Sequence, residues 1–126
     1  MYFPNAPAPK PNIIKLVDNP PTNNIAIGTN AGKANSGNNN INIGTNSGVA
    51  ANLGFFNVGM GANALTSQVG GDFNVAIGND ALEQLQTGTT NTAVGKAAGS
   101  TVVGFTNTTN LGHNSQAQAD NEVVLG

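Results

Sequence analysis

The chain has 126 residues, of which only 8% are charged, and its formal net charge is −2. Four basic side chains in a single domain's length of sequence cannot form the dense basic surface typical of proteins that bind nucleic acids or anionic membranes. There is no run of about 18 apolar residues and no cysteine, so neither a membrane-spanning segment nor disulfide chemistry is expected. We therefore predict neither nucleic acid as a partner nor insertion into a membrane.

The first 22 residues differ in composition from the rest of the chain. All six prolines lie before Thr22, which predicts an extended segment at residues 1–22, with a possible short strand at residues 12–18 between two proline clusters. The opening lacks the basic-then-apolar order of a secretory signal, so no signal peptide is expected in this chain. A second region, the repeat domain, is predicted to cover residues 23–126.

One short phrase recurs through residues 23–126. It reads NIAIG at 24, NINIG at 40, NVGMG at 57, NVAIG at 74 and NTAVG at 91, with weaker copies TTNLG at 108 and EVVLG at 122. A period of 16–17 residues is too short for repeats built from helix pairs. It predicts an all-β fold, a parallel β-roll or β-solenoid of about seven coils, each with two short strands and two turns.

Apolar residues alternate with small or polar ones inside each phrase. Alternation with a period of two predicts a strand with one buried face. We predict that these apolar side chains form the core of the repeat and the contact between chains. They are Ile25, Ile27, Ile41, Ile43, Val58, Met60, Val75, Ile77, Val94, Leu111, Val123 and Leu125. This apolar stripe is narrow and needs a second apolar surface to cover it. We therefore predict an oligomer and favour a homotrimer.

Asparagine and glycine keep fixed places in the repeat. The recurrent asparagines are Asn24, Asn40, Asn57, Asn74 and Asn91, and the glycines that close the phrases are Gly28, Gly44, Gly61, Gly78, Gly95 and Gly112. The amides are expected either to form a hydrogen-bonded ladder along the axis or only to tolerate a left-handed turn. The glycines are expected to allow the following turn. Residues 62–71 and 80–88 are each compatible with a single helical turn.

Few residues are candidates for chemistry. His113 follows a turn glycine and is expected to be a solvated loop residue, and the carboxylates lie at unlike phases of the repeat. We therefore predict no catalytic residue, no metal site, no cofactor and no enzymatic activity. Phe55, Phe56 and Phe73 are candidates for a surface that stacks on sugar rings, with filling of a subunit interface as the alternative. Phe105 lies near the same phase and favours the packing alternative.

The phrases NIAIG, NVAIG, NTAVG and EVVLG resemble the head repeats of YadA-type trimeric autotransporter adhesins. With the Ala-Leu pairs at 64–65 and 81–82 and the Thr-Gly pair at 87–88, they are still more similar to repeats of bacteriophage and phage-like tail fibres. The ending ADNEVVLG resembles the last coil before the intramolecular chaperone of such fibres. The resemblance covers about residues 23–126 and implies a trimer of parallel β-rolls.

The function implied by this resemblance is that of a structural and receptor-recognition segment of a fibre, located in a virion or on a cell surface. Residues 1–21 would then attach the segment to other fibre or particle components, and the partner would be a glycan or protein of a host surface. The chain lacks stalk heptads and an anchor, which favours a phage fibre over an adhesin head. An ice-binding β-solenoid is a further alternative, but Thr29, Thr45, Thr66, Thr87 and Thr92 do not share one phase.

Overall fold

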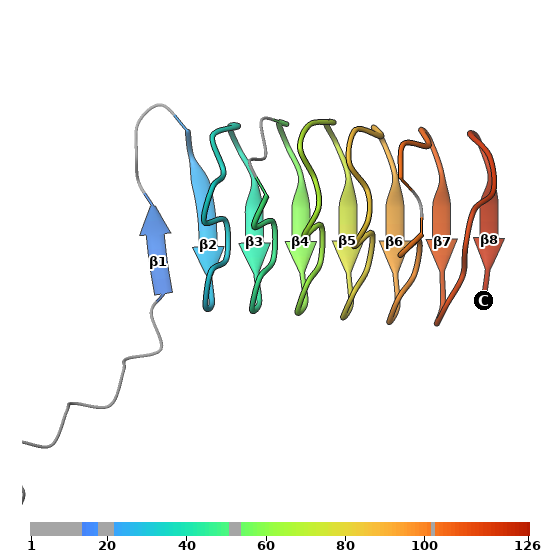
Figure 1. The fold of residues 1–126 in the computed structure, drawn as a ribbon, viewed down its shortest axis with the longest axis horizontal. Helices are drawn as coiled ribbons and strands as arrows, with labels where there is room; N and C mark the ends of the chain where they lie inside the picture. Colours follow the sequence, from blue (N-terminus) through green and yellow to red (C-terminus); the bar gives the residue numbers. More distant parts are fainter. Residues whose placement is uncertain (1–13, 18–21, 51–53, 102) are drawn as a thin grey trace, which may run out of the picture.

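The computed structural model describes residues 14–17, 22–50, 54–101 and 103–126. Its eight strands form one sheet in chain order (Figure 1). The strands are β1 (Ile14–Val17), β2 (Asn24–Ile27), β3 (Ile41–Ile43), β4 (Val58–Met60), β5 (Val75–Ile77), β6 (Thr92–Val94), β7 (Thr109–Leu111) and β8 (Val123–Leu125). Strands β2 to β8 are parallel and belong to a β-solenoid of about six turns, which confirms the predicted all-β repeat architecture.

The N-terminal strand differs from the others in direction. Strand β1 pairs antiparallel with β2, with Ile14 opposite Ile27, and so lies along the edge of the sheet at the first coil. It falls inside the strand expected at residues 12–18. The predicted docking role of residues 1–21 rests mainly on residues 1–13 and 18–21, which lie outside the described part of the chain.

Each coil contributes one strand rather than the two that were predicted. In the described residues, the wall opposite the sheet consists of turns, which are joined from coil to coil by backbone hydrogen bonds. Leu65 N donates to Ala81 O at 3.1 Å, and Leu82 N donates to Ala98 O at 3.0 Å. Leu65 and Leu82 have φ angles of 54° and 47°, so this wall has a left-handed backbone at its centre. The coil therefore closes without a second sheet.

The helical turns considered at residues 62–71 and 80–88 are not formed. Both segments consist of turns and bends, and no helix occurs in the described residues. Asp80, the expected helix N-cap, has a φ of 59°, and Leu82 is also left-handed. Leu82 and Leu85 are both buried inside the coil without a helix, and they are joined by a turn in which Leu85 N donates to Leu82 O at 3.1 Å.

The register of the sheet aligns every phrase with the next. Ile25, Ile41, Val58 and Val75 are paired in sequence, and so are the residues on either side of them. In each strand the central residue is buried and its two neighbours are not, apart from β8, where the central Val124 is half-buried. Since successive side chains of a strand point to opposite faces, the small central residue points into the coil.

The apolar residues of the phrases therefore do not form the core of the single chain, and this prediction is wrong. All twelve are half-buried or exposed, whereas the small residues between them, such as Ala76 and Ala93, are fully buried. The physical reason is space: the coil is narrow, and its interior is shared with side chains from the turn wall. The contribution of the twelve residues to contact between chains stays a prediction.

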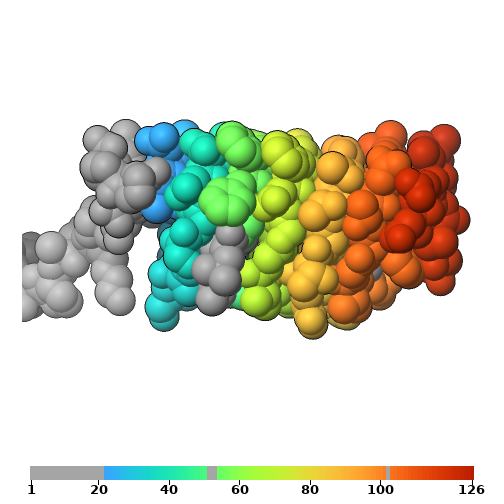
Figure 2. Space-filling model, turned by 90° about the horizontal axis from the view of Figure 1, so that it is seen from above, coloured from blue at the N-terminus to red at the C-terminus, as the bar shows by residue number. Residues whose placement is uncertain are grey.

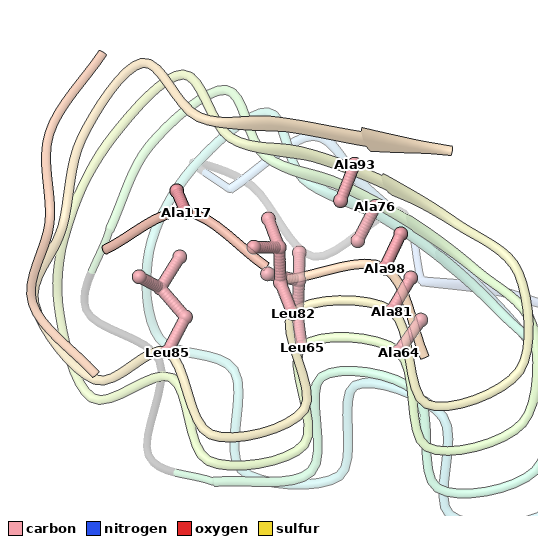
Figure 3. Close-up of a cluster of buried hydrophobic side chains, with 9 residues drawn as sticks. All are labelled: Ala64, Leu65, Ala76, Ala81, Leu82, Leu85, Ala93, Ala98 and Ala117. Atoms are coloured by element: carbon pink, nitrogen blue, oxygen red, sulfur yellow. The ribbon is translucent and has the colours of Figure 1, made fainter. Parts of the chain in front are cut away.

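The core lies inside the coils and is made of alanine and leucine. Figure 3 shows Leu65 and Leu82 next to each other at the centre of the cluster, with Ala64, Ala81 and Ala98 in a row on one side and Leu85 and Ala117 on the other. The cluster consists of Ala64, Leu65, Ala76, Ala81, Leu82, Leu85, Ala93, Ala98 and Ala117. Half-buried Phe105 and Val124 pack against it. The leucines and Ala64, Ala81 and Ala98 come from the turn wall, whereas Ala76 and Ala93 come from strands β5 and β6.

The coil that begins with β3 fills the same space in the opposite way. Here strand residue Asn42 is large and buried, and the turn residue in the position of Leu65 is Gly48. A Cβ atom on Gly48 would collide with the Asn42 amide, so a leucine and Asn42 cannot occupy one coil. In the next coil Gly59 replaces Asn42, and Leu65 fills the space. Side-chain volume is thus exchanged between strand and turn within one coil.

Candidate functional site

A column of asparagines lies along the start of the strands. The main-chain N–H groups of Asn40, Asn57, Asn74 and Asn91 each donate to the Oδ1 of the asparagine one coil earlier, at 2.8–2.9 Å. Each Nδ2 donates to a carbonyl of the next coil, as from Asn74 to Gly88 O at 2.8 Å. Thr108 replaces asparagine at the end of the column and donates through both N and Oγ1 to Asn91 Oδ1.

This column is structural, and its geometry decides between the two expectations for these residues. The five asparagines are buried and none has a positive φ; the left-handed residues are the ones just before them, such as Asn39 and Thr90. The amides thus bond adjacent coils to each other, as a ladder does. Left-handed asparagines do occur in a second, more exposed column, formed by Asn30, Asn46 and Asn63 and continued by Asp80.

Three titratable residues, His113, Asp72 and Asp120, form side-chain hydrogen bonds with the neighbouring coil. His113 is exposed, and its ring lies 3.1 Å from Lys96 O and from Asn114 Nδ2. Asp72 accepts from Phe55 N at 2.8 Å, and Asp120 accepts from Thr106 N at 2.8 Å, each across one coil. Within residues 14–17, 22–50, 54–101 and 103–126, no three His, Asp or Glu side chains come together as a metal site would require.

The most extended candidate surface is the outer side of the sheet. We call it the outer apolar face and define it by the twelve apolar strand residues given above. One of its two rows is apolar in all seven coils: Ile27, Ile43, Met60, Ile77, Val94, Leu111 and Leu125. Met60, Ile77, Val94 and Leu111 are 38–39% exposed in the single chain. Because the coils stack in one straight body (Figure 2), these residues form a continuous strip along its length.

A second candidate surface is aromatic and occupies only two coils. We call it the aromatic cluster and define it as Phe55, Phe56 and Phe73, which are 41%, 51% and 56% exposed. The rings of Phe56 and Phe73 are stacked, with centroids 5.3 Å apart and planes inclined by 3°. Phe105 does not belong to this cluster: it is half-buried against the core, and its carbonyl accepts from Asn91 Nδ2 at 2.7 Å.

Comparison with known proteins adds no assignment. No protein-family model matches this chain. The searches of curated proteins and of solved structures also found no match. In the part of the chain that is described, there is no helix with the length and apolar character needed to cross a bilayer.

Sequence reasoning identified the residues of both surfaces but not all of the interior polar ones. Asn42 is 1% exposed, and neither its Nδ2 nor its Oδ1 has a hydrogen-bond partner. Asn110, at the same position near the other end, donates to Thr108 Oγ1 and accepts from Ala117 N. The available signal was the position itself, because the equivalent residues in four other coils are alanine or glycine: Ala26, Gly59, Ala76 and Ala93.

Proposed function

We propose that this chain is a structural and receptor-recognition segment of a homotrimeric fibre of the phage or phage-like tail-fibre type. The observation that carries the proposal is the outer apolar face, which runs the length of the solenoid and is uncharged. Covering the exposed part of one such side chain contributes on the order of 0.5–1 kcal/mol. The free-energy contributions of all the coils add up only if the partner surface has the same spacing as the strip. A second copy of the chain has that spacing.

Threefold symmetry suits the dimensions of the strands. A strand of three residues spans about 10 Å, so three such faces around an axis would enclose a core only one or two side chains wide. The apolar rows would then close on one another with little space between them. The resemblance of the repeats to trimeric fibre segments supports the same symmetry. Three copies would also present three equivalent binding surfaces, which raises the avidity of weak contacts with a host surface.

The second candidate is the head of a bacterial trimeric adhesin, which would use the same fold and the same contacts. The phrases NIAIG and EVVLG resemble both groups, so the reading frame around the coding sequence separates them. A chaperone domain downstream favours the fibre, and a membrane anchor favours the adhesin. Ice binding, a further alternative, has less support, because the outward strand positions in register with the outer apolar face carry threonine only at Thr92 and Thr109.

Light scattering of the chain in dilute buffer tests the proposed assembly. We expect a mass three times the chain mass of 12.6 kDa. The variant Ile77→Asp would place three carboxylates around the axis and is expected to be monomeric, with the circular dichroism of folded β-structure. Gln84→Glu adds the same charge in the turn wall of the same coil and should remain trimeric. A monodisperse wild-type monomer would contradict the proposal.

A further inference from the structure

The aromatic cluster places bulky rings at a backbone position that asparagine holds in most other coils. Phe56 and Phe73 have φ angles of 57° and 59°, and the equivalent residues, also with positive φ, are Asn23, Asn39, Thr90, Asn107 and Asn121. Asparagine adopts this left-handed backbone at little cost, whereas a bulky aromatic residue there is an outlier. The phenylalanines are therefore unfavourable for the local backbone and leave apolar rings in water. Residues of this kind commonly mark a functional site.

The cluster is also not explained by contact between chains through the outer apolar face. That face has apolar residues in every coil, whereas the aromatic rings occur in two coils only. The residues at the positions of Phe55 and Phe56 are Asn38 and Asn39 one coil earlier, and Thr89 and Thr90 two coils later. A protein partner needs a contiguous surface of several hundred Å². Three rings bounded by polar residues suit a smaller, amphipathic ligand.

The geometry of the stack indicates where such a ligand would lie. Phe56 and Phe73 occupy the same position in consecutive coils, and their centroid separation of 5.3 Å is close to the spacing of about 4.8 Å between strands. The rings therefore stack along the axis of the solenoid. At the next level is Thr90, whose side chain is short and whose hydroxyl donates to Thr89 O. The position next to the Phe73 ring in the following coil is therefore occupied by a short polar side chain and not by a third aromatic ring.

We propose that the aromatic cluster is a carbohydrate-binding site, in which a pyranose ring stacks on the free face of the Phe73 ring. This inference rests on the proposed function, recognition of a receptor on a host surface. The apolar face of a sugar ring packs on an aromatic ring, and its hydroxyl groups need polar partners at the edge. Asp72 lies between Phe55 and Phe73 and uses Oδ1 to accept from Phe55 N, which holds the carboxylate in place. Asp72 and the threonine pair supply acceptors and donors at the edge of the stack.

The test is a titration of the full chain, in its native assembly and with labelled phenylalanine, followed by NMR. The probes are the methyl glycosides of glucose, galactose, mannose and N-acetylglucosamine in the millimolar range, where single-sugar contacts are observable. At least one glycoside should shift the ring resonances of Phe56 and Phe73. Phe73→Asn restores the residue found in other coils, should fold, and is expected to weaken binding roughly tenfold. Val69→Asn removes an exposed apolar side chain elsewhere and should leave binding unchanged.

Three results would overturn the inference: no shift with any of the four glycosides, undiminished binding by Phe73→Asn, or dissociation of the assembly by Phe73→Asn. The last would identify the cluster as a contact between chains. Failure of the inference is distinguishable from failure of the proposed function. A wild-type trimer that binds no glycoside contradicts only the sugar site, whereas a wild-type monomer whose rings respond to a glycoside contradicts only the trimer.

Discussion

Replacing Asn74 with alanine is expected to lower the free energy of unfolding by about 3–6 kcal/mol. The side chain accepts from Asn91 N at 2.9 Å and donates to Gly88 O at 2.8 Å, and it is fully buried. Alanine would leave both main-chain groups without partners, at about 1–3 kcal/mol each, and would add a small cavity. In a solenoid each coil is stabilised mainly by its neighbours, so the loss affects the coils on both sides.

Urea denaturation at a fixed protein concentration measures this effect, since the midpoint of an oligomer depends on concentration. Asn38→Ala is the matched control: Asn38 is half-buried, lies outside the column, and is expected to change the unfolding free energy by less than about 0.5 kcal/mol. Equal effects of the two substitutions would show that the asparagine column contributes nothing specific to stability.

Replacing Gly78 with alanine is expected to destabilise the chain by about 2–6 kcal/mol. Gly78 has a φ of +134°, which L-residues rarely adopt, and an added Cβ would lie 2.5 Å from the carbonyl oxygen of Gly95 in the next coil. Backbone strain and overpacking each cost about 1–3 kcal/mol. The neighbouring atom belongs to the backbone of a stacked coil, so it cannot move without lengthening the hydrogen bonds between coils.

Gly70→Ala is the control for Gly78→Ala, because Gly70 lies only eight residues away in the chain. A Cβ on Gly70 would have no atom within 4 Å, and Gly70 does not have a positive φ. Alanine there is expected to be neutral or slightly stabilising, because it reduces the freedom of the unfolded chain. Thermal unfolding of the two variants measures the difference. If Gly70→Ala lowered the midpoint as much as Gly78→Ala, close stacking of the turn glycines would not be the cause.

The repeat and its register could be predicted because their cause is local. A coil of fixed length returns the chain to the same point, so residues with the same role recur at the same spacing. The glycines at Gly61, Gly78 and Gly95 must recur because the backbones of successive coils meet there. The recurrence of asparagine at one corner could be predicted for the same reason, whereas the choice between a hydrogen-bonded ladder and a left-handed turn required the structure.

The direction of the strand faces could not be predicted from alternation alone. Alternation shows that Val75 and Ile77 share a face, but it does not show which face points into the coil. That depends on the width of the coil, which is set by the turn wall, where Leu65, Leu82 and Leu85 fill the interior. The small residue at the centre of β4, β5 and β6 (Gly59, Ala76 and Ala93) was the available signal, because only a small residue leaves space for those leucines.

The aromatic cluster was partly accessible from sequence. The shared phase of Phe56 and Phe73 predicted that they would be neighbours, and the two rings are stacked. Phe105 lies near the phase of these residues in the sequence, but in the structure it holds a different position of the coil. Its backbone occupies the place of Gly88 in the asparagine column, and its ring packs against the core. Exposure and backbone conformation, which distinguish the cluster from core packing, required the structure.

The most direct test of the central claim, that the outer apolar faces of three chains meet, is oxidative cross-linking through single cysteines. The chain has no cysteine of its own, so Val75→Cys, Ile77→Cys and Gln84→Cys each introduce one thiol. A disulfide requires Cα atoms within about 7 Å. We expect covalent dimers from at least one of the two sheet variants and monomers from Gln84→Cys. Monomers from both sheet variants, with dimers from Gln84→Cys, would contradict the account.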